Sequence, residues 1–286
     1  MIYLLLSVLF SSGLFVIFKY FVIYKIDTLK AIVVNYVVAF SLGISFSDST
    51  FSFNEIPQKP WFFGAMVLGA LFISVFFVMA NTAQQNGVSV ASVAGKMSVV
   101  IPVIFGIVLY DESYSLWKVI GVLIALISVY LTSVKEQGTT LKAGLLFPIL
   151  LFFGSGAIDT ILKYVEVNFV QKNEVSLFSG SLFGFAAIFG LLILSIKTIR
   201  KRASFGFKNI IAGIILGIPN YFTIVFIIKA LQTAGFESST LFTVNNVTVV
   251  VLSTLVGFLL FKEKFSLKNK IGVVLAILGI VLVAVA

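Results

Sequence analysis

Long apolar runs alternate with short polar segments along the whole chain. Ten of these runs are close to the roughly 20 residues that an α-helix needs to cross a bilayer. The breaks between them carry charged residues, glycines and prolines, which are typical of turns. We therefore expect an all-α integral membrane protein whose ten transmembrane helices pack as one bundle, at residues 2–22, 29–46, 61–80, 88–110, 116–133, 144–164, 176–196, 209–231, 238–261 and 267–286.

The composition strengthens this interpretation and excludes several kinds of enzyme. Of 286 residues, 60% are hydrophobic and 11% are charged, whereas a soluble domain has about 25% charged residues. The excess of apolar surface needs the lipid bilayer as its partner. The chain contains neither cysteine nor histidine, so disulfides, thiol nucleophiles, serine–histidine pairs and zinc sites of the usual kind are excluded. We expect no enzyme, no catalytic residue, no metal, no cofactor and no nucleic acid.

The chain repeats itself at an offset of 151 residues. The segment 110–125 aligns with 261–276, and the shared residues include the Gly-Val pair of each segment. This divides the chain into two five-helix repeats, residues 1–140 and 141–286. Five is an odd number, so the second repeat enters the membrane from the opposite side. Two inverted repeats are a common transporter design, in which the substrate site lies near the midplane between them.

Several of these features resemble the EamA-like branch of the drug/metabolite transporter superfamily. The resemblance covers nearly the whole chain and is specific for the superfamily rather than for a substrate. It implies a secondary transporter, often an exporter of amino acids or related metabolites, with a central cavity between the halves. One departure is Ser253, where a proline is expected on the ninth helix, so the two halves need not bend alike. The residues that carry the resemblance are Pro102, Glu112, Glu263, Ser12-Gly13 with Lys19, and Ser155-Gly156 with Lys163.

Lys96 is the most informative single residue. It lies roughly 12 Å into the fourth apolar run, where a charged side chain is unfavourable by at least ~2.5–3.5 kcal/mol. The repeat places it opposite Val247, beside Asn245 and Asn246. These three polar residues are therefore expected to line a substrate cavity, in which Lys96 binds a carboxylate or phosphate, or titrates because burial lowers its pKa. The alternative is a structural lysine that bonds a carbonyl or an acidic side chain.

Other polar residues inside the apolar runs are weaker candidates. Asp159 is expected to serve as the counter-ion of Lys96 or as a proton carrier, unless it only reaches interfacial water. Pro219 predicts a kink or break in the eighth helix, which would present Asn220 and Tyr221 to a substrate; a simple packing kink is the alternative. Asn35 is a further substrate candidate, although a lone asparagine often only joins helices.

Four residues before the fifth and tenth helices predict helix caps instead of a binding site. Ser115 and Ser266 stand at N-cap positions. Glu112 and Glu263 lie three residues earlier, where a carboxylate is favourable near a helix N-terminus. We interpret all four as structural.

The expected function is secondary active transport of small polar metabolites such as amino acids, by alternating access and in the direction of export. Protons are a candidate coupling ion, and the alternative is a passive channel or facilitator for small solutes. The expected location is the plasma (inner) membrane. Loops after the odd-numbered helices carry 14 of the 20 lysines and arginines, which places both termini outside by the positive-inside rule; relatives usually have both termini inside.

Overall fold

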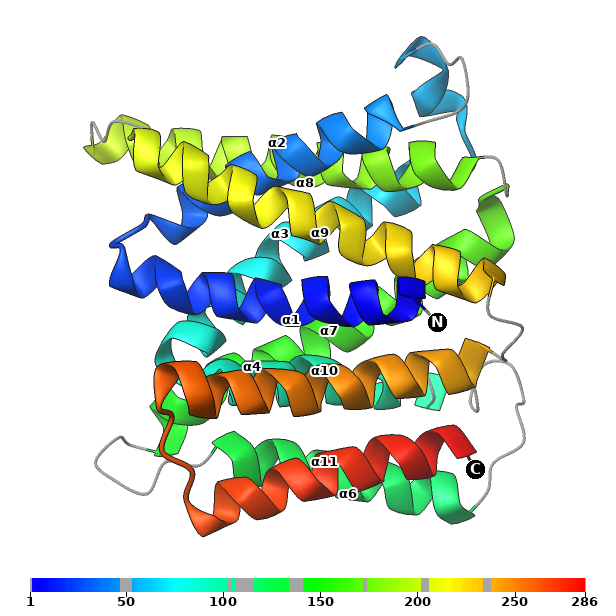
Figure 1. Cartoon of the computed structure of the whole chain (residues 1–286). Helices are drawn as coiled ribbons and strands as arrows, with labels where there is room; N and C mark the ends of the chain where they lie inside the picture. Colours follow the sequence, from blue (N-terminus) through cyan, green and yellow to red (C-terminus); the bar gives the residue numbers. More distant parts are fainter. Residues whose placement is uncertain are drawn as a thin grey trace. The chain divides into compact units, whose positions relative to one another are not determined.

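The described part of the chain is almost entirely helical. The computed structural model describes residues 2–46, 53–101, 104–105, 116–133, 141–171, 174–201, 206–233 and 238–285, and it contains no strand in these ranges. Figure 1 shows the helices in chain order. Their bounds are α1 Ile2–Ile23, α2 Thr28–Ser45, the 3₁₀ helix η1 Phe53–Gln58, α3 Phe62–Gln85, α4 Val88–Met97, α6 Leu116–Ser133, α7 Leu141–Phe169, α8 Val175–Lys201, α9 Phe207–Thr233, α10 Ser238–Phe261 and α11 Leu267–Val285.

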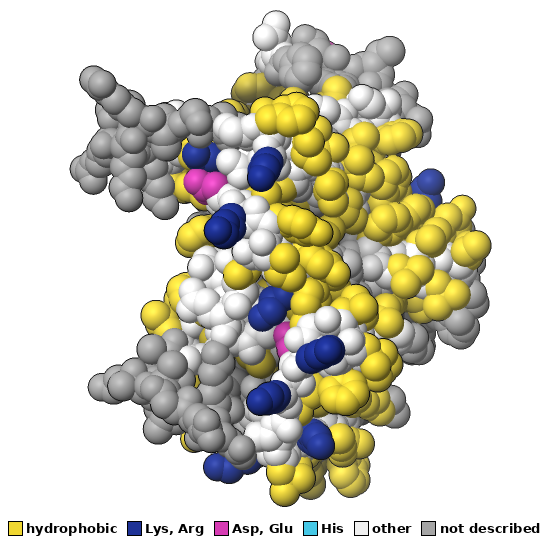
Figure 2. Space-filling model, turned by 60° about the vertical axis from the view of Figure 1, so that its left-hand side comes forward, with side chains coloured by type: hydrophobic (Ala, Val, Ile, Leu, Met, Phe, Trp, Pro, Cys, Tyr) yellow, Lys and Arg dark blue, Asp and Glu magenta, His cyan; other side chains and the backbone are white. Residues whose placement is uncertain are grey.

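Six described segments are long and apolar enough to cross a membrane. They lie at Ile2–Ile23, Thr28–Ser45, Phe62–Gln85, Gly144–Leu162, Ser176–Ile196 and Phe207–Ile227, and three shorter apolar helices cover Val88–Met97, Val119–Thr132 and Asn245–Phe261. Many large apolar side chains on these helices remain exposed, and wide apolar areas are visible beside the lysines and arginines in Figure 2. A water-soluble protein rarely exposes so much apolar surface. The protein is therefore a multi-pass membrane protein.

The chain forms two compact units. The first unit consists of residues Met1–Tyr20, Val78–Ala157 and Phe222–Ala286, and the second of Phe21–Phe77 and Ile158–Tyr221. The boundaries fall inside α1, α3, α7 and α9. Each unit thus contains segments from both halves of the sequence. The two compact units therefore do not coincide with the two sequence repeats.

Within each unit, helices that hold equivalent places in the two halves pack against each other. In the first unit α6 packs along α11 and α4 packs along α10, and in the second unit α2 packs along α8. The pairs α6–α11 and α2–α8 are visible side by side in Figure 1. The cores of both units are therefore built from elements far apart in the sequence.

Glycines allow the close packing of the second unit. A Cβ atom on Gly43 of α2 would lie 2.8 Å from the Cα atom of Gly180 on α8. A Cβ atom on Gly217 of α9 would lie 2.8 Å from the carbonyl oxygen of Asn35 on α2. Both distances are shorter than real Cβ contacts, so α8 and α9 approach α2 only because side chains are missing there.

The fourth apolar run does not form the continuous helix expected over residues 88–110. α4 ends at Met97, and Ser98 and Val99 form a turn. Pro102 explains the break, because it has no amide hydrogen for the carbonyl of Ser98 and its ring would collide with that carbonyl in a regular helix. The Ser98 carbonyl accepts instead from the amide of Ile101 at 2.9 Å. At ~1.5 Å per residue, the ten residues of α4 span only about half of a ~30 Å hydrocarbon layer.

Ser253 of α10 is the counterpart of Pro102, and α10 is continuous from Ser238 to Phe261. The buried Ser253 hydroxyl lies at hydrogen-bonding distance from the carbonyl of Val249, one turn back in the same helix. Serine keeps the amide that proline lacks, so the helix is not interrupted. The two halves therefore differ at this position.

Candidate functional site

Lys96 lies in the last turn of α4, at the point where that helix stops. Its side chain is half-buried. The last carbonyls of a helix have no partner in the helix, and they give its C-terminus a partial negative charge that favours a cation. One of these carbonyls, that of Gly95, accepts a hydrogen bond from Ser98 Oγ at 2.6 Å. A lysine at an interrupted helix deep in an apolar run matches the discontinuous helices from which transporters build their binding sites.

The packing of α4 on α10 brings two asparagines close to the depth of Lys96. Gly257, near the end of α10, lies against Ser89 at the start of α4, so the two packed helices run in opposite directions. Counted from this contact at ~1.5 Å per residue, Lys96 lies about 10 Å and Asn246 about 16 Å along the pair. Lys96 and Asn246 therefore differ in depth by only ~6 Å, and Asn245 precedes Asn246.

Asn245 carries an unused hydrogen-bonding atom. Both asparagines are buried, at 5% and 8% exposure. In the part of the chain that the structure describes, the Asn245 Oδ1 atom is buried without a hydrogen-bond partner. Leaving such an acceptor unsatisfied costs about 1–3 kcal/mol. Lys96, Asn245 and Asn246 thus combine a cation, an available acceptor and amide donors at the α4–α10 contact, which suits a small ligand bearing an anionic group.

The second unit contains a separate buried amide pair. Asn220 Nδ2 donates to Asn35 Oδ1 at 3.1 Å, and both residues are buried. Asn35 Nδ2 has no partner among the described residues. Tyr221, also buried, stacks on Phe46 with ring centroids 6.0 Å apart. The six residues expected to bind substrate therefore fall into two groups: Lys96, Asn245 and Asn246 in the first unit, and Asn35, Asn220 and Tyr221 in the second.

α9 continues as one helix through Pro219, so the break expected there is absent. Asp159 lies on α7 in the second unit, and its side chain is exposed. An ionised carboxylate within a spanning segment faces water or a polar partner, because contact with lipid is strongly unfavourable. This exposed position is consistent with a coupling residue.

Glu263 contacts a helix other than the one the sequence suggested. Its Oε1 atom accepts from the amide of Val88 at 2.7 Å, and its Oε2 atom accepts from Ser89 Oγ at 3.1 Å. It therefore caps α4, whereas Ser266 caps the helix that follows it. Ser266 Oγ accepts from the amide of Asn269 at 3.2 Å, and Asn269 Oδ1 accepts from the amide of Ser266 at 3.1 Å. Glu112 and Ser115 lie outside the described residues.

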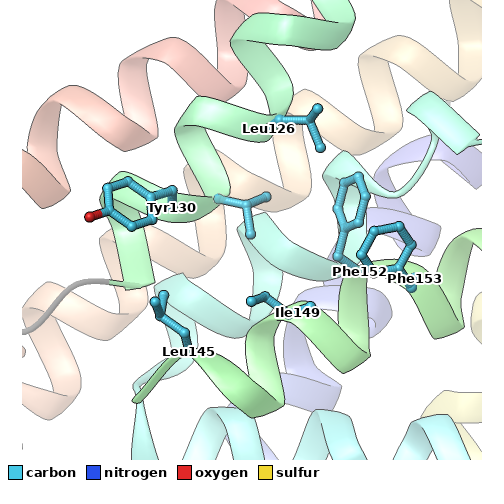
Figure 3. Close-up of a pocket in the computed structure, with 7 residues that line it drawn as sticks. Leu126, Tyr130, Leu145, Ile149, Phe152 and Phe153 are labelled. Carbon is cyan, nitrogen blue, oxygen red and sulfur yellow. The ribbon is translucent and has the colours of Figure 1, made fainter. Parts of the chain in front are cut away.

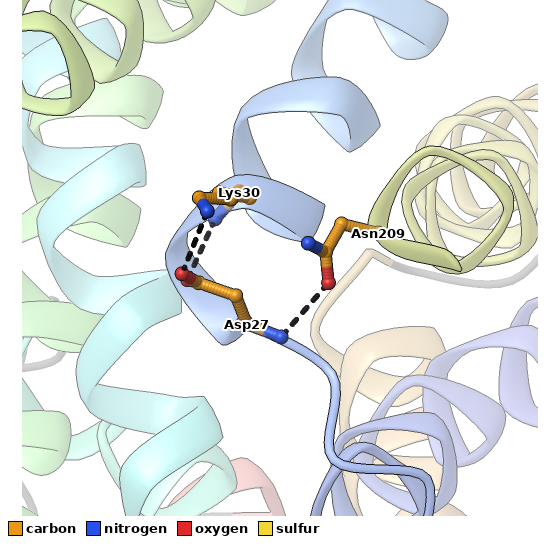
Figure 4. A network of polar contacts seen from close by, with 3 residues as sticks. All are labelled: Asp27, Lys30 and Asn209. Atoms are coloured by element: carbon orange, nitrogen blue, oxygen red, sulfur yellow. Dashed lines mark hydrogen bonds and ion pairs between the residues drawn. The ribbon is translucent and has the colours of Figure 1, made fainter. Parts of the chain in front are cut away.

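Two polar clusters in the second unit were missed by sequence reasoning. In the first, Asp27 caps α2 and pairs with the buried Lys30 at 3.5 Å. The amide of Asp27 donates to Asn209 Oδ1, in the first turn of α9, at 2.9 Å (Figure 4). Asp27 stands one residue before an apolar run, which is a cap signal. Its bond to Asn209 joins positions far apart in the sequence and leaves no local signal.

In the second cluster, Glu174 accepts from Lys59 Nζ at 2.8 Å and from Trp61 Nε1 at 3.0 Å. Burial alone would raise the pKa of the Glu174 carboxyl, but the two hydrogen bonds and the charge of Lys59 outweigh it and hold that pKa below its usual value. The hydrogen bond with Glu174 raises the pKa of Lys59. Lys59, Trp61 and Glu174 all precede spanning helices, so this cluster ties the starts of α3 and α8 together.

One apolar groove in the first unit is a poor site for a polar ligand. It has a volume of ≈170 Å³ and lies between α6 and α7 (Figure 3). Apart from the hydroxyl of Tyr130, its lining side chains carry no polar group. The groove suits contact with lipid. Its lining residues are Leu126, Val129, Tyr130, Leu145, Ile149, Phe152 and Phe153.

Comparisons with known proteins agree with this architecture. A family model described as the EamA-like transporter family matches the chain twice, over residues 1–134 and 142–285. An uncharacterized protein of Haemophilus influenzae is 28% identical over 264 residues, which cover 88% of this chain and 86% of that protein. A solved crystal structure with 15% sequence identity superposes with a TM-score of 0.59 and covers 97% of this chain and 96% of that one. At this identity the crystal structure shows a shared fold alone.

Proposed function

Because the chain belongs to the EamA-like transporter family and is a membrane transporter of the drug/metabolite type, we propose that it is a secondary active exporter of small polar metabolites, such as amino acids. The observation that supports this most directly is Lys96 at the interrupted end of α4. A cation held at that depth, beside broken backbone, favours a ligand with a carboxylate or phosphate group.

In this proposal, Lys96 neutralises the anionic group of the substrate. The buried Oδ1 atom of Asn245, which has no partner among the described residues, accepts from an N–H group of the same molecule, and Asn246 adds amide donors. An amino acid carries both an anionic group and an N–H group. A solute without the anion would lose the charge-assisted contact with Lys96, so it would bind more weakly than a solute that carries one.

Asn35, Asn220 and Tyr221 of the second unit are a separate group of proposed substrate-binding residues. Asn35 Nδ2 has no hydrogen-bond partner in the described part of the chain, and this donor suits a carbonyl or carboxylate oxygen. The two repeats, residues 1–140 and 141–286, would rock around the bound substrate and expose it to each side of the membrane in turn. Asp159 is the proposed carrier of a coupled proton, and the proposed location is the inner membrane.

The test is transport by purified protein in proteoliposomes, with pooled amino acids and small metabolites and with or without a proton gradient. We expect one class of anionic or zwitterionic compounds to move with the wild type, and Lys96→Ala to lower its rate at least tenfold, because loss of a charge-assisted contact is worth about 1.5–3 kcal/mol. Lys96→Arg keeps the positive charge and changes the shape of the side chain. Transport by this variant therefore shows whether the charge alone is sufficient.

Lys268→Ala on α11 is the matched control, because it removes an exposed lysine. Unchanged transport in Lys96→Ala would make this lysine structural.

A passive facilitator is the second candidate function. It would equilibrate the solute without accumulating it, whatever the proton gradient, whereas a coupled exporter builds a concentration ratio.

A further inference from the structure

The start of α4 lacks a cap of its own. Its N-cap residue is Gly87, which has no side chain to satisfy the first amides of the helix. These amides need acceptors, and the N-terminus carries a partial positive charge. The Glu263 carboxylate supplies both needs, through the amide of Val88 at 2.7 Å and the hydroxyl of Ser89 at 3.1 Å.

Glu263 comes from the other half of the chain, and its position is set by unusual backbone. It follows α10 directly, after Lys262, whose φ of 49° lies in the left-handed region that residues other than glycine rarely adopt. The Glu263 amide donates back to the carbonyl of Gly257 at 3.1 Å. The end of α10 thus aims the carboxylate at α4, and the strain at Lys262 is held by this arrangement.

Two glycines leave the space that the carboxylate occupies. A Cβ atom on Gly257 would lie 2.6 Å from Glu263 Oε2 and 2.8 Å from Ser89 Oγ. A Cβ atom on Gly87 would lie 2.8 Å from Glu263 Oε1, and its φ of 115° also disfavours a side chain. The fit at both glycines shows that the contact is closely packed in this conformation.

Further contacts lie at the same end of the first unit. Lys19 Nζ of α1 donates to the carbonyl of Gln84 at 3.4 Å, near the end of α3. Asn86 Nδ2 donates to the carbonyl of Gly144 on α7 at 2.7 Å. The rings of Tyr20 and Phe261 meet edge to face at 5.3 Å. The Asn86, Tyr20 and Glu263 contacts each join the first half of the chain to the second.

We propose that Glu263 is a latch: its carboxylate locks the half-helix α4 to the end of α10, and its release opens this end of the first unit during transport. α4 carries Lys96 near its other end, eight residues after Val88, so Glu263 acts as a positioning residue for the substrate lysine. This inference rests on the proposed transport function. It adds a named contact that must break in each cycle.

The chain contains no cysteine, so single cysteines can report on the latch without a background signal. Ser92, fully buried one turn below Ser89, becomes the reporter as Ser92→Cys. Protein in lipid nanodiscs is treated with a water-soluble maleimide, and the labelling rate is compared with and without Glu263→Gln. We expect labelling about tenfold faster with Glu263→Gln, because the charge-assisted part of the contact is lost.

Two controls separate opening from general loosening. Glu55→Gln, an exposed carboxylate on η1, should leave the labelling of Ser92→Cys unchanged. Ser181→Cys, buried in the second unit, should label at the same slow rate with and without Glu263→Gln. Equal labelling of Ser92→Cys in both backgrounds overturns the latch, and so does faster labelling at both reporter positions.

Gly257→Ala provides an independent variant, which carries the test if Glu263→Gln fails to fold. Its added Cβ atom displaces the carboxylate without removing it, so Ser92→Cys should again label faster. No substrate enters the labelling experiment. Its outcome therefore tests the latch separately from the proposed transport function, which is tested by the Lys96→Ala experiment.

Discussion

The polar side chains that distinguish this protein from a generic apolar bundle each face a different electrostatic requirement. Lys96 meets the negative end of an interrupted helix, and Glu263 meets the positive end of the same helix. Asn35 and Asn220 satisfy part of each other's hydrogen-bonding capacity. In an apolar medium a polar group without a partner is strongly unfavourable, and each of these contacts supplies a partner. The positions of these few polar residues are therefore closely determined.

The pair of Lys59 and Glu174 leads to a prediction on pH. The pKa of Glu174 is lowered, so its stabilisation is present above its unfolded value of about 4.3 and is lost as the pH falls through the folded value. The pKa of Lys59 is raised, so its contribution is present below about 10.4 and is lost as the pH rises through its folded value. Both contributions are therefore complete between these limits.

Glu174→Gln should lower the melting temperature of the detergent-solubilised protein across this pH range, and the difference from the wild type should shrink below about pH 4. Glu55→Gln is the comparison, since that carboxylate is exposed and acts on Lys59 only through its charge, so its removal should lower the melting temperature less. Melting curves of the three proteins at several pH values decide the matter. A difference that stays constant from pH 7 to pH 3 would contradict the assigned role of the pair.

Sequence reasoning reached single residues only where the signal is local. Lys96, Asn35 and Asn220 stood out because a polar residue in an apolar run is conspicuous. The partner of Glu263 could not be recognised in this way, because Val88 lies 175 positions away and no local pattern near either residue indicates the contact. Its own helix offered a nearer N-terminus, which Ser266 and Asn269 cap without it.

At the scale of helices, the apolar runs predicted where helices exist better than where they end. α8 continues to Lys201, beyond its apolar run, because charged residues keep the backbone hydrogen bonds of a helix. α4 stops early because Pro102 outweighs an unbroken apolar pattern. Hydropathy indicates whether a segment prefers lipid or water. It carries no information on one missing backbone amide, so a continuous helix and an interrupted helix have the same apolar pattern.

Glycine substitution should disrupt the contact between α2 and α8. Gly43→Ala places a Cβ atom 2.8 Å from the backbone of Gly180, so one helix must shift. We expect a loss of roughly 1–3 kcal/mol in the free energy of unfolding, measured by denaturant titration in detergent. Gly13→Ala on α1 is the matched control, because its Cβ atom would meet nothing within 4 Å. Equal stability of the two variants would refute the packing argument.

At the scale of the whole molecule, the duplication is the dominant feature. The family model matches both halves, and equivalent helices from the two halves pack together within each unit. The repeat was readable from the sequence because identical residues recur at a fixed offset. The sequence did not show which segments make up each compact unit, because contacts between helices distant in the chain decide which segments share a core.

The distribution of charge predicts the orientation of the chain in the membrane. The loops after the odd-numbered predicted helices carry 14 of the 20 lysines and arginines, and such loops stay in the cytoplasm. An alkaline phosphatase fused to the C-terminus should therefore be active, since that enzyme works only outside the cytoplasm, and a fluorescent protein fused there should be dark. The opposite pair of results would reverse the orientation.

The unequal pair formed by Pro102 and Ser253 has a consequence for the resting state. Two identical halves that exchange conformations would give two facing states of the same energy, each occupied half of the time. One helix is interrupted and its counterpart is not, so this degeneracy is removed. A bias of only ~1.4 kcal/mol makes one state about ten times as populated as the other. Within the proposed alternating-access cycle, a single proline in one copy of the duplicated chain would therefore contribute to a preference for one of the two facing states.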